Sequence, residues 1–297
     1  MIEINGLTKV YRNKKGIFDV HFTVEEGEVF GFLGPNGAGK TTTIRQLMGF
    51  LKPDGGSASI GGLDCWKDAA AIQKNLGYLP GEIAFMEHMT GLQLIRFMAE
   101  MRGMKGLGGA DALIDRFELD TRGKIRKMSK GMKQKLGLVC AFFHDPAVLI
   151  LDEPTSGLDP LMQNRFVELV LEEKARGKTI LMSSHMFEEV ERTCGRVGII
   201  KSGHLIAVET TTRLREAKSK RFAVTFASEE AAVSFQAEGF AVKVAEGATL
   251  QVKIKGELTP FLAALGRYPV ENLETATQSL EEIFMHYYGE EGEGHVQ

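Results

Sequence analysis

The stretch GPNGAGKT, at residues 34–41, constrains the fold of this chain more than any other feature. It fits the pattern G-x-x-x-x-G-K-[ST] and lies between a predicted strand and a predicted helix, which is the context that the pattern requires. Its glycines let backbone N–H groups turn toward phosphate oxygens, while the Lys40 side chain adds a mobile positive charge. The pattern therefore predicts a phosphate-binding loop and helix start formed by Gly34, Pro35, Asn36, Gly37, Ala38, Gly39, Lys40, Thr41 and Thr42.

A second stretch, AVLILDEPT at residues 147–155, supplies the acidic groups that a nucleotide-hydrolysing loop needs. Its apolar residues predict a buried strand, and Asp152 at the carboxyl end of that strand is expected to lie beside the loop. There Asp152, acting through water, and the hydroxyl of Thr41 are the expected Mg²⁺ groups. Glu153 is the expected general base for the attacking water, so the pair favours hydrolysis over binding alone. An ordinary cap at a strand end is the alternative interpretation of both acids.

Length and composition limit the class of protein. The chain has 297 residues, which favours one large domain and a smaller one, and its formal net charge of −3 gives no general attraction to nucleic acid or anionic membranes. No apolar run approaches the roughly 20 residues that cross a bilayer, and the N-terminus lacks the apolar core of a signal peptide. The 3 cysteines are widely spaced and match neither a disulfide framework nor a zinc pattern, which fits a reducing cytosol.

The order of predicted strands and helices divides the chain into parts. Up to about residue 210, apolar strands alternate with polar helices, which is typical of an α/β fold with a largely parallel sheet. We expect this part to be one domain at residues 1–215, with a helical subdomain at about 82–143. Short elements then follow in the order β-α-β-β-α-β, which predicts a small, ferredoxin-like α+β domain at residues 218–288. That range ends with a predicted helix, SLEEIFMHYYG, and residues 289–297 form an acidic tail that we expect to be frayed.

Further motifs decide among the families that share the phosphate-binding loop, which include kinases, GTPases, helicases and transporter ATPases. From about residue 2 to 210 the chain resembles the ATP-binding subunit of ABC transporters. Tyr11 stands where that family has an aromatic residue that stacks on adenine, and SGLD, which ends at Asp159, resembles the D-loop that crosses to a partner subunit. His185, after the predicted strand ILMSS, resembles the switch histidine that contacts the γ-phosphate. From the residues alone, the alternative interpretations are that Tyr11 is a structural tyrosine on an edge strand and that His185 is an ordinary surface histidine.

The basic stretch MSKGMKQK, at residues 128–135, lies upstream of the acidic pair at the spacing of the ABC signature, usually written L-S-G-G-Q. Ser129 and Gly131 are retained. The resemblance implies that their hydroxyl and N–H groups, at a helix N-terminus, donate to the γ-phosphate of ATP bound by the other subunit. Lys130 and Met132 depart from the family pattern.

A second departure lies at Gly81, in GYLPGE, where the family commonly has a glutamine. In the family that glutamine senses Mg²⁺ and water and links the site to the membrane subunit, so Glu82 is the candidate to take over part of its role. Both departures resemble variants of the ABC-2 exporter branch, whose members export drugs, peptide antibiotics or lipids.

The resemblance implies a P-loop NTPase core with a β-subdomain and a helical subdomain, which hydrolyses ATP to drive a separate membrane protein. A homodimer, or a pair of such subunits, would hold two ATP–Mg²⁺ head to tail, so that each site needs both chains. A separate transmembrane permease is expected to dock over residues 81–101 and to hold the chain on the inner, cytoplasmic face of the cell membrane. The Met and Phe side chains there suit an adaptable docking surface. An equally favoured alternative is that these Met and Phe side chains fill the core of the helical subdomain.

Two other classes of function are less favoured. A soluble ABC-type ATPase switch that acts on the ribosome or nucleic acid would use Lys124–Lys135 as a basic patch. Such proteins generally carry two cassettes in one chain, long coiled coils or zinc-binding cysteines, none of which this sequence shows, so no nucleic-acid partner is expected. A kinase would share the phosphate-binding loop, but it would leave Ser129, Gly131, Asp159 and His185 unexplained.

Overall fold

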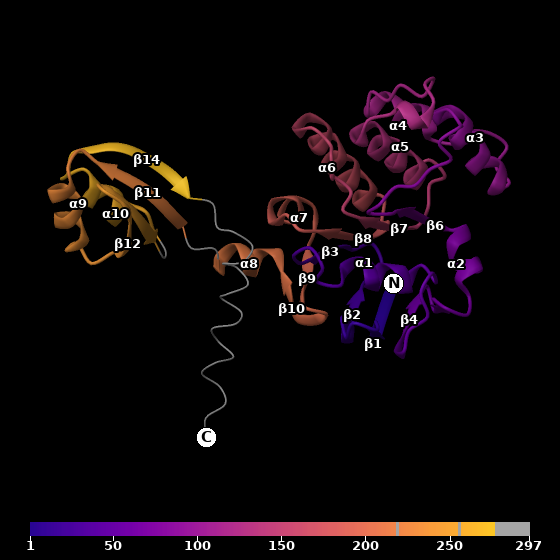
Figure 1. Cartoon of the computed structure of the whole chain (residues 1–297), viewed down its shortest axis with the longest axis horizontal. Coiled ribbons are helices and arrows are strands. Elements are labelled where there is room, and N and C mark those ends of the chain that lie inside the picture. The colour runs from indigo at the N-terminus through magenta and orange to yellow at the C-terminus, as the bar shows by residue number, and fades with distance from the viewer. Residues whose placement is uncertain (218–219, 255–256, 277–297) are drawn as a thin grey trace. The chain divides into compact units, whose positions relative to one another are not determined.

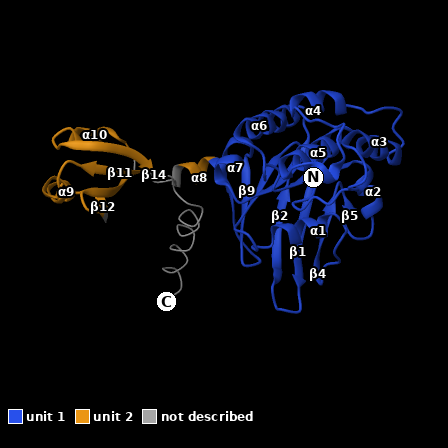
Figure 2. Cartoon of the chain, turned by 45° about the horizontal axis from the view of Figure 1, so that its top comes forward, with its two compact units in different colours: residues 1–211 blue, residues 212–297 orange. Residues whose placement is uncertain are grey.

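The computed structural model describes residues 1–217, 220–254 and 257–276 of the chain (Figure 1). The chain divides into two compact units, Met1–Thr211 and Thr212–Gln297 (Figure 2). The predicted helix SLEEIFMHYYG and the predicted tail at residues 289–297 lie outside the described residues. Each unit is therefore considered by itself.

A six-stranded sheet forms the centre of the first unit, in the order β10-β9-β3-β8-β7-β6. Neighbouring strands are parallel except β9 and β10, which confirms the prediction of a largely parallel sheet. All residues of β3 and β8 are buried, as expected for strands that are covered on both faces. The strands are β3 (Val29–Leu33), β6 (Leu76–Leu79), β7 (Val148–Asp152), β8 (Thr179–Ser184), β9 (Arg196–Lys201) and β10 (His204–Thr210).

A second, antiparallel sheet has the order β2-β1-β4-β5 and is the β-subdomain that the resemblance implies. Its strands are β1 (Ile2–Val10), β2 (Gly16–Val24), β4 (Gly55–Ile60) and β5 (Leu63–Asp64). Phe22 of β2 stacks on Phe30 of β3 with 5.0 Å between ring centroids, so the two sheets share one core. Helix α1 (Lys40–Leu47) buries Ile44 and Leu47 in that core, and α2 (Ala69–Lys74) follows β5.

The helical subdomain lies on the opposite side of the central sheet from β1, β2 and β4 (Figure 1). It contains α3 (Gly91–Met101), α4 (Ala110–Arg116), the 3-10 turn Ile125–Lys127 and α5 (Lys130–Phe142). Arg102, at the end of α3, donates from its guanidinium to the carbonyl oxygens of Gln73, Lys74 and Leu76 at 3.0–3.3 Å. This guanidinium therefore ties the end of α3 to the start of β6.

Two more helices of the first unit follow strands of the central sheet: α6 (Pro160–Ala175) and α7 (Phe187–Thr193). Helix α8 (Thr211–Ala217) begins at the boundary between the two units. Both α6 and α7 begin shortly after strands that end in polar residues, Asp152 for β7 and Ser184 for β8. In parallel sheets, loops at the carboxyl ends of strands meet along one edge, where ligands bind. The loops before α6 and α7 are therefore placed beside the predicted phosphate-binding loop that precedes α1.

The second unit has the predicted element order, β-α-β-β-α-β. It comprises β11 (Lys220–Phe226), α9 (Glu229–Gln236), β12 (Ala241–Glu246), β13 (Thr249–Ile254), α10 (Thr259–Leu265) and β14 (Val270–Ala276). The sheet order is β12-β13-β11-β14 with antiparallel pairs throughout, which is the ferredoxin-like arrangement. Phe226, Phe235 and Phe261 are almost fully buried, so this unit has an aromatic core of its own.

Burial also explains the behaviour of the cysteines. Cys65, Cys140 and Cys194 are free and buried, and burial raises the pKa of each thiol to about 12. They are protonated side chains that fill space in the core. Among the described helices, none combines the length and the apolar character needed to cross a membrane.

Candidate nucleotide-binding site

The loop between β3 and α1 curls around the amino group of Lys40. Lys40 Nζ donates to the carbonyl oxygens of Gly34 at 2.6 Å and Pro35 at 3.3 Å, and the lysine is only 5% exposed. Gly39 has φ 116°, and a Cβ there would lie 2.6 Å from a methyl of Ile17, so a side chain cannot fit at this turn. The loop therefore brings a buried ammonium group to the N-terminus of α1, which is an anion-binding arrangement.

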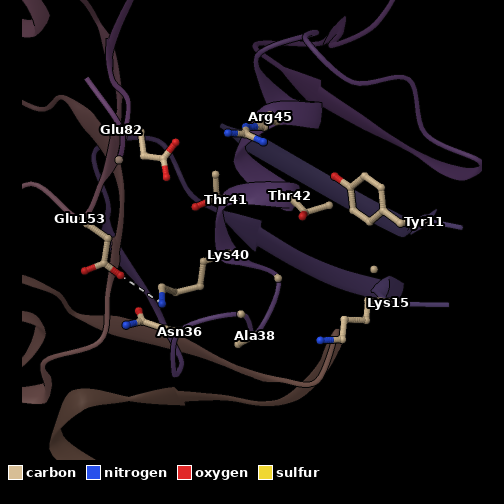
Figure 3. A pocket seen from close by; sticks show the side chains of 14 residues that line it. Tyr11, Lys15, Asn36, Ala38, Lys40, Thr41, Thr42, Arg45, Glu82 and Glu153 are labelled. Carbon is tan, nitrogen blue, oxygen red and sulfur yellow. Dashed lines mark ion pairs between the residues drawn. The ribbon is translucent and has the colours of Figure 1, made fainter. Parts of the chain in front are cut away.

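Glu153 connects Lys40 to His185. Lys40 Nζ lies 3.1 Å from Glu153 Oε1, an ion pair without hydrogen-bond geometry, and Figure 3 shows the two side chains facing each other. His185 Nδ1 lies 2.5 Å from the other carboxylate oxygen. Glu153 has φ 51°, a conformation that costs energy for a residue with a Cβ and that is often found at functional sites. The structure thus brings together three predicted site residues from three separate segments.

Asp152 is completely buried and contacts Thr41 directly. Its Oδ2 accepts a hydrogen bond from Thr41 Oγ1 at 2.8 Å, and its Oδ1 accepts one from Ser183 Oγ at 2.5 Å. A carboxylate beside a hydroxyl is a hard oxygen set that fits Mg²⁺, which usually keeps waters and phosphate oxygens as its other ligands. Ser183 was not predicted as a site residue from the sequence. Its position opposite Asp152 depends on the register of β7 and β8, which no single motif reveals.

The loop opens into a cavity of about 370 Å³. Tyr11 lines it and is 39% exposed, and Figure 3 shows Tyr11 and Lys15 on the opposite side of the loop from Glu153. Lys15 and Arg45 add positive charge to the wall, and sequence reasoning missed both because neither belongs to a motif. The cavity is lined by Tyr11, Lys15, Gly16, Asn36, Gly37, Ala38, Gly39, Lys40, Thr41, Thr42, Arg45, Gly81, Glu82 and Glu153.

Ser129, Gly131 and Asp159 are not among the residues that line this cavity. Ser129 is exposed at the start of α5, and its Oγ accepts a hydrogen bond from the N–H of Met132 at 3.2 Å. Asp159 caps α6 in the same way, with Oδ1 accepting from the N–H of Met162 at 3.0 Å. Within one chain, both side chains therefore satisfy helix N-termini.

The start of α5 packs against the loop that follows Glu153. Gln134 is 3% exposed, and its Nε2 donates to the carbonyl oxygens of Glu153 at 3.2 Å and Pro154 at 2.8 Å. A Cβ at Gly157 would lie 3.2 Å from the Lys130 side chain, so the lysine stem covers this glycine. Gln134 was not singled out from the sequence, because its partners lie 19 and 20 residues farther along the chain.

Gly81 lies directly against Asp152. A Cβ at this position would be 3.0 Å from Asp152 Oδ2, so a larger side chain would press on the buried carboxylate. Glu82 lines the cavity on the same side as Glu153 (Figure 3). The glycine therefore leaves space beside Asp152, and Glu82 is the neighbouring polar group.

Comparison with known protein sequences gives one consistent result. The sequence profile described as "ABC transporter" matches residues 17–156. The linearmycin resistance ATP-binding protein LnrL of Bacillus subtilis is 36% identical over 72% of this chain and 70% of its own length. The uncharacterized ABC transporter ATP-binding protein YhcH of Bacillus subtilis is 34% identical over 98% of this chain and 96% of its own. The bacitracin transport ATP-binding protein BcrA of Bacillus licheniformis is 34% identical, with 81% and 79% covered.

Comparison with solved structures agrees. An ATP-binding subunit of an ABC transporter is 32% identical and superposes with a TM-score of 0.67 over 73% of this chain and 92% of its own. The ATP-binding cassette MJ0796, solved as a dimer in a post-hydrolysis state with ADP and Pi, has a TM-score of 0.65 over 71% of this chain and 99% of its own. At 20% identity, the second likeness bears on the fold alone.

Proposed function

Since this chain belongs to the ABC transporter ATP-binding proteins, the family of the relatives above, we propose that it powers an exporter of a drug, peptide or lipid. It is an ATP-binding subunit that hydrolyses ATP in a transporter. The names of two relatives, one for linearmycin resistance and one for bacitracin transport, support the proposed class of cargo. They favour a transporter over the alternative of a switch that acts on ribosomes or nucleic acid.

The contact of Glu153 with both Lys40 and His185 is the observation that carries the proposed chemistry. Glu153 is the general base that orients and deprotonates the attacking water. Lys40 binds the β- and γ-phosphates, and His185 holds Glu153 and contacts the γ-phosphate. The pairing of Lys40 with Glu153 offsets the charge of each group where both side chains are largely removed from water.

The remaining proposed contacts divide between the nucleotide and magnesium. Tyr11 stacks on adenine, and the loop residues Gly34, Pro35, Asn36, Gly37, Ala38, Gly39, Lys40, Thr41 and Thr42 hold the phosphates. Thr41 and Asp152 are the residues that would hold Mg²⁺, since their oxygens already lie together. When bound, the ion neutralises charge on the phosphates during phosphoryl transfer. Ser183 keeps the Asp152 carboxylate turned toward Thr41.

Cassettes of this family work in pairs with transmembrane subunits. For this chain we propose a homodimer, in which Ser129, Gly131 and Asp159 act on nucleotide held by the other copy, and a separate permease docked over residues 81–101. The exposed position of Ser129 and its absence from the chain's own cavity support the first part. Met101 is 73% exposed, whereas Ile95 is fully buried, so α3 has both a core face and a free face. The free face of α3 supports the proposed docking of a permease over residues 81–101.

The proposed roles are tested with Glu153→Gln in the purified full-length chain. The variant keeps the size of the side chain but loses the base, so ATP turnover should fall at least about a hundredfold. ATP should then hold the variant as a dimer in size-exclusion chromatography with light scattering. Glu118→Gln, at a surface ion pair with Arg165, is the matched control. A Glu153→Gln protein that stays monomeric with undiminished turnover would refute the proposal.

A further inference from the structure

Glu189 is a buried acid that the proposed chemistry does not use. It lies on α7, close to the start of the helix that follows His185, and it is 8% exposed. Its Oε1 is buried and has no hydrogen-bond partner. A buried carboxyl oxygen without a partner is costly, and a plain helix in this place would be more stable with an apolar residue. The acid therefore calls for a reason beyond packing.

The other carboxyl oxygen of Glu189 holds the turn that carries His185. Ser184 Oγ lies 2.6 Å from Glu189 Oε2, and the same Oγ accepts a hydrogen bond from the N–H of Met186 at 2.9 Å. A serine hydroxyl has one proton. The carbonyl of Met186 is its alternative acceptor at 3.3 Å, so the shorter contact assigns that proton to Glu189. Both hydrogen bonds join Ser184, the residue before His185, to residues that follow His185, so they close the turn that carries this histidine.

The surroundings of Glu189 also change its pKa. Burial raises the pKa of the Glu189 carboxyl, the hydroxyls of Ser184 and Thr155 lower it, and the negative charge of Glu153 raises it. Burial is the strongest influence, and the net result is a pKa raised to about 7. The direct contact of this buried carboxyl is with Ser184, the residue before His185.

We propose that Glu189 is a positioning residue for ATP hydrolysis, which fixes the turn of His185 through Ser184. The inference rests on the proposed roles of His185 and Glu153 and adds a third group that acts through Ser184. The contact between His185 Nδ1 and Glu153 Oε2 is 2.5 Å, a distance that small rotations of the turn would lengthen. Because catalysis depends on such alignment, loosening it should lower turnover more than it weakens ATP binding.

The test compares Glu189→Ala, Glu189→Gln and Ser184→Ala in the full-length chain, with the exposed neighbour Glu188→Ala as the control. Glu189→Ala and Ser184→Ala should each lower kcat about tenfold and change the KM for ATP less than about twofold. Glu189→Gln keeps an acceptor oxygen for Ser184 Oγ and should restore kcat to within about threefold of the unchanged protein. If Glu189→Ala does not fold, Ser184→Ala breaks the same connection with a smaller change in the core.

A double-mutant cycle separates this inference from the proposed function. In a His185→Ala background, Glu189→Ala should lower kcat no further, because its effect passes through His185. Equal, independent losses in both backgrounds, or a Glu189→Gln variant as slow as Glu189→Ala, would overturn the positioning role. If His185→Ala and Glu153→Gln themselves leave turnover unchanged, the proposed function fails instead.

Discussion

Replacing Glu189 by glutamine should change how the stability of the first unit depends on pH. Burial raises the pKa of Glu189 to about 7 from an ordinary value of 4.5. Between these two pH values the folded chain keeps a proton that the unfolded chain has released. Stability is therefore lost as the pH rises through this window, and the whole cost is present above the folded pKa. Glutamine has no proton to lose, so the variant should escape this cost.

The expected size follows from the pKa values. At about 1.4 kcal/mol for each pH unit, the full cost of ionising Glu189 in the folded state is about 3 kcal/mol. Between a pH of about 5.5 and a pH of about 8, about 2 kcal/mol of this develops. The stability of Glu189→Gln relative to the unchanged protein should therefore increase by about 2 kcal/mol over that range.

Urea titrations at several pH values measure this difference. The chain has 1 tryptophan, Trp66, which lies in the first unit, so its fluorescence reports the unfolding of that unit. Glu188→Gln on the exposed side of α7 serves as the control and should keep a constant difference from the unchanged protein. A Glu189→Gln difference that is equally constant between the two pH limits would refute the reasoning, because Glu189 would then ionise as easily in the folded chain as in the unfolded one.

Three further outcomes are expected. Gly131→Ala should lower ATP turnover at least about tenfold, because a Cβ there would lie 2.7 Å from the carbonyl oxygen of Gly157 and must displace the start of α5. A phosphate-release assay compares this variant with Gly123→Ala, whose Cβ meets open space, and equal turnover of the two would contradict the prediction. Gln134→Leu should lower the free energy of unfolding by about 2–4 kcal/mol, because it leaves the carbonyl oxygens of Glu153 and Pro154 without this donor. A loss below about 0.5 kcal/mol in a urea titration would contradict the role of Gln134 in stabilising the loop after Glu153. Burial and then the charge of Arg102 lower the pKa of His144 to about 4 from 6.5, so the folded state loses stability as the pH falls through this range. Melting curves should show that the unchanged protein loses more stability than His144→Gln between a pH of about 7 and a pH of about 5. Equal losses in the two proteins would exclude this cause.

The sequence predicts the phosphate-binding loop because everything that shapes the loop is local. The spacing of Gly34, Gly39 and Lys40 fixes a strand, a turn and a helix start within a few residues, and the structure has each of them there. The alternation of strands and helices likewise predicts the parallel sheet, and the order β-α-β-β-α-β predicts the second unit. Each of these inferences uses neighbours in the chain.

The contacts that hold the acids in place join residues that are distant in the chain. Ser183 meets Asp152 only because β8 lies beside β7 in a particular register. Gln134 and Glu189 appear in the sequence as ordinary polar residues of amphipathic helices, and their burial depends on the path of the loop after Glu153. Propensity and periodicity do not contain that path, so these residues could be found only once the fold was known.

The connection between α5 and the Glu153 loop has a mechanical consequence. Ser129, which begins α5, and Gln134, which binds the carbonyl oxygens of Glu153 and Pro154, are separated by only about 8 Å along the helix axis. A piece of helix of about one and a half turns is too short and too stiff to bend, so both groups move with it as one rigid body. A force applied to Ser129 by a ligand outside this chain's own cavity would therefore reach Glu153 without a relay of rearranging side chains. In a pair of such chains, tighter binding of one nucleotide would shift the carboxylate that we propose activates water at the other.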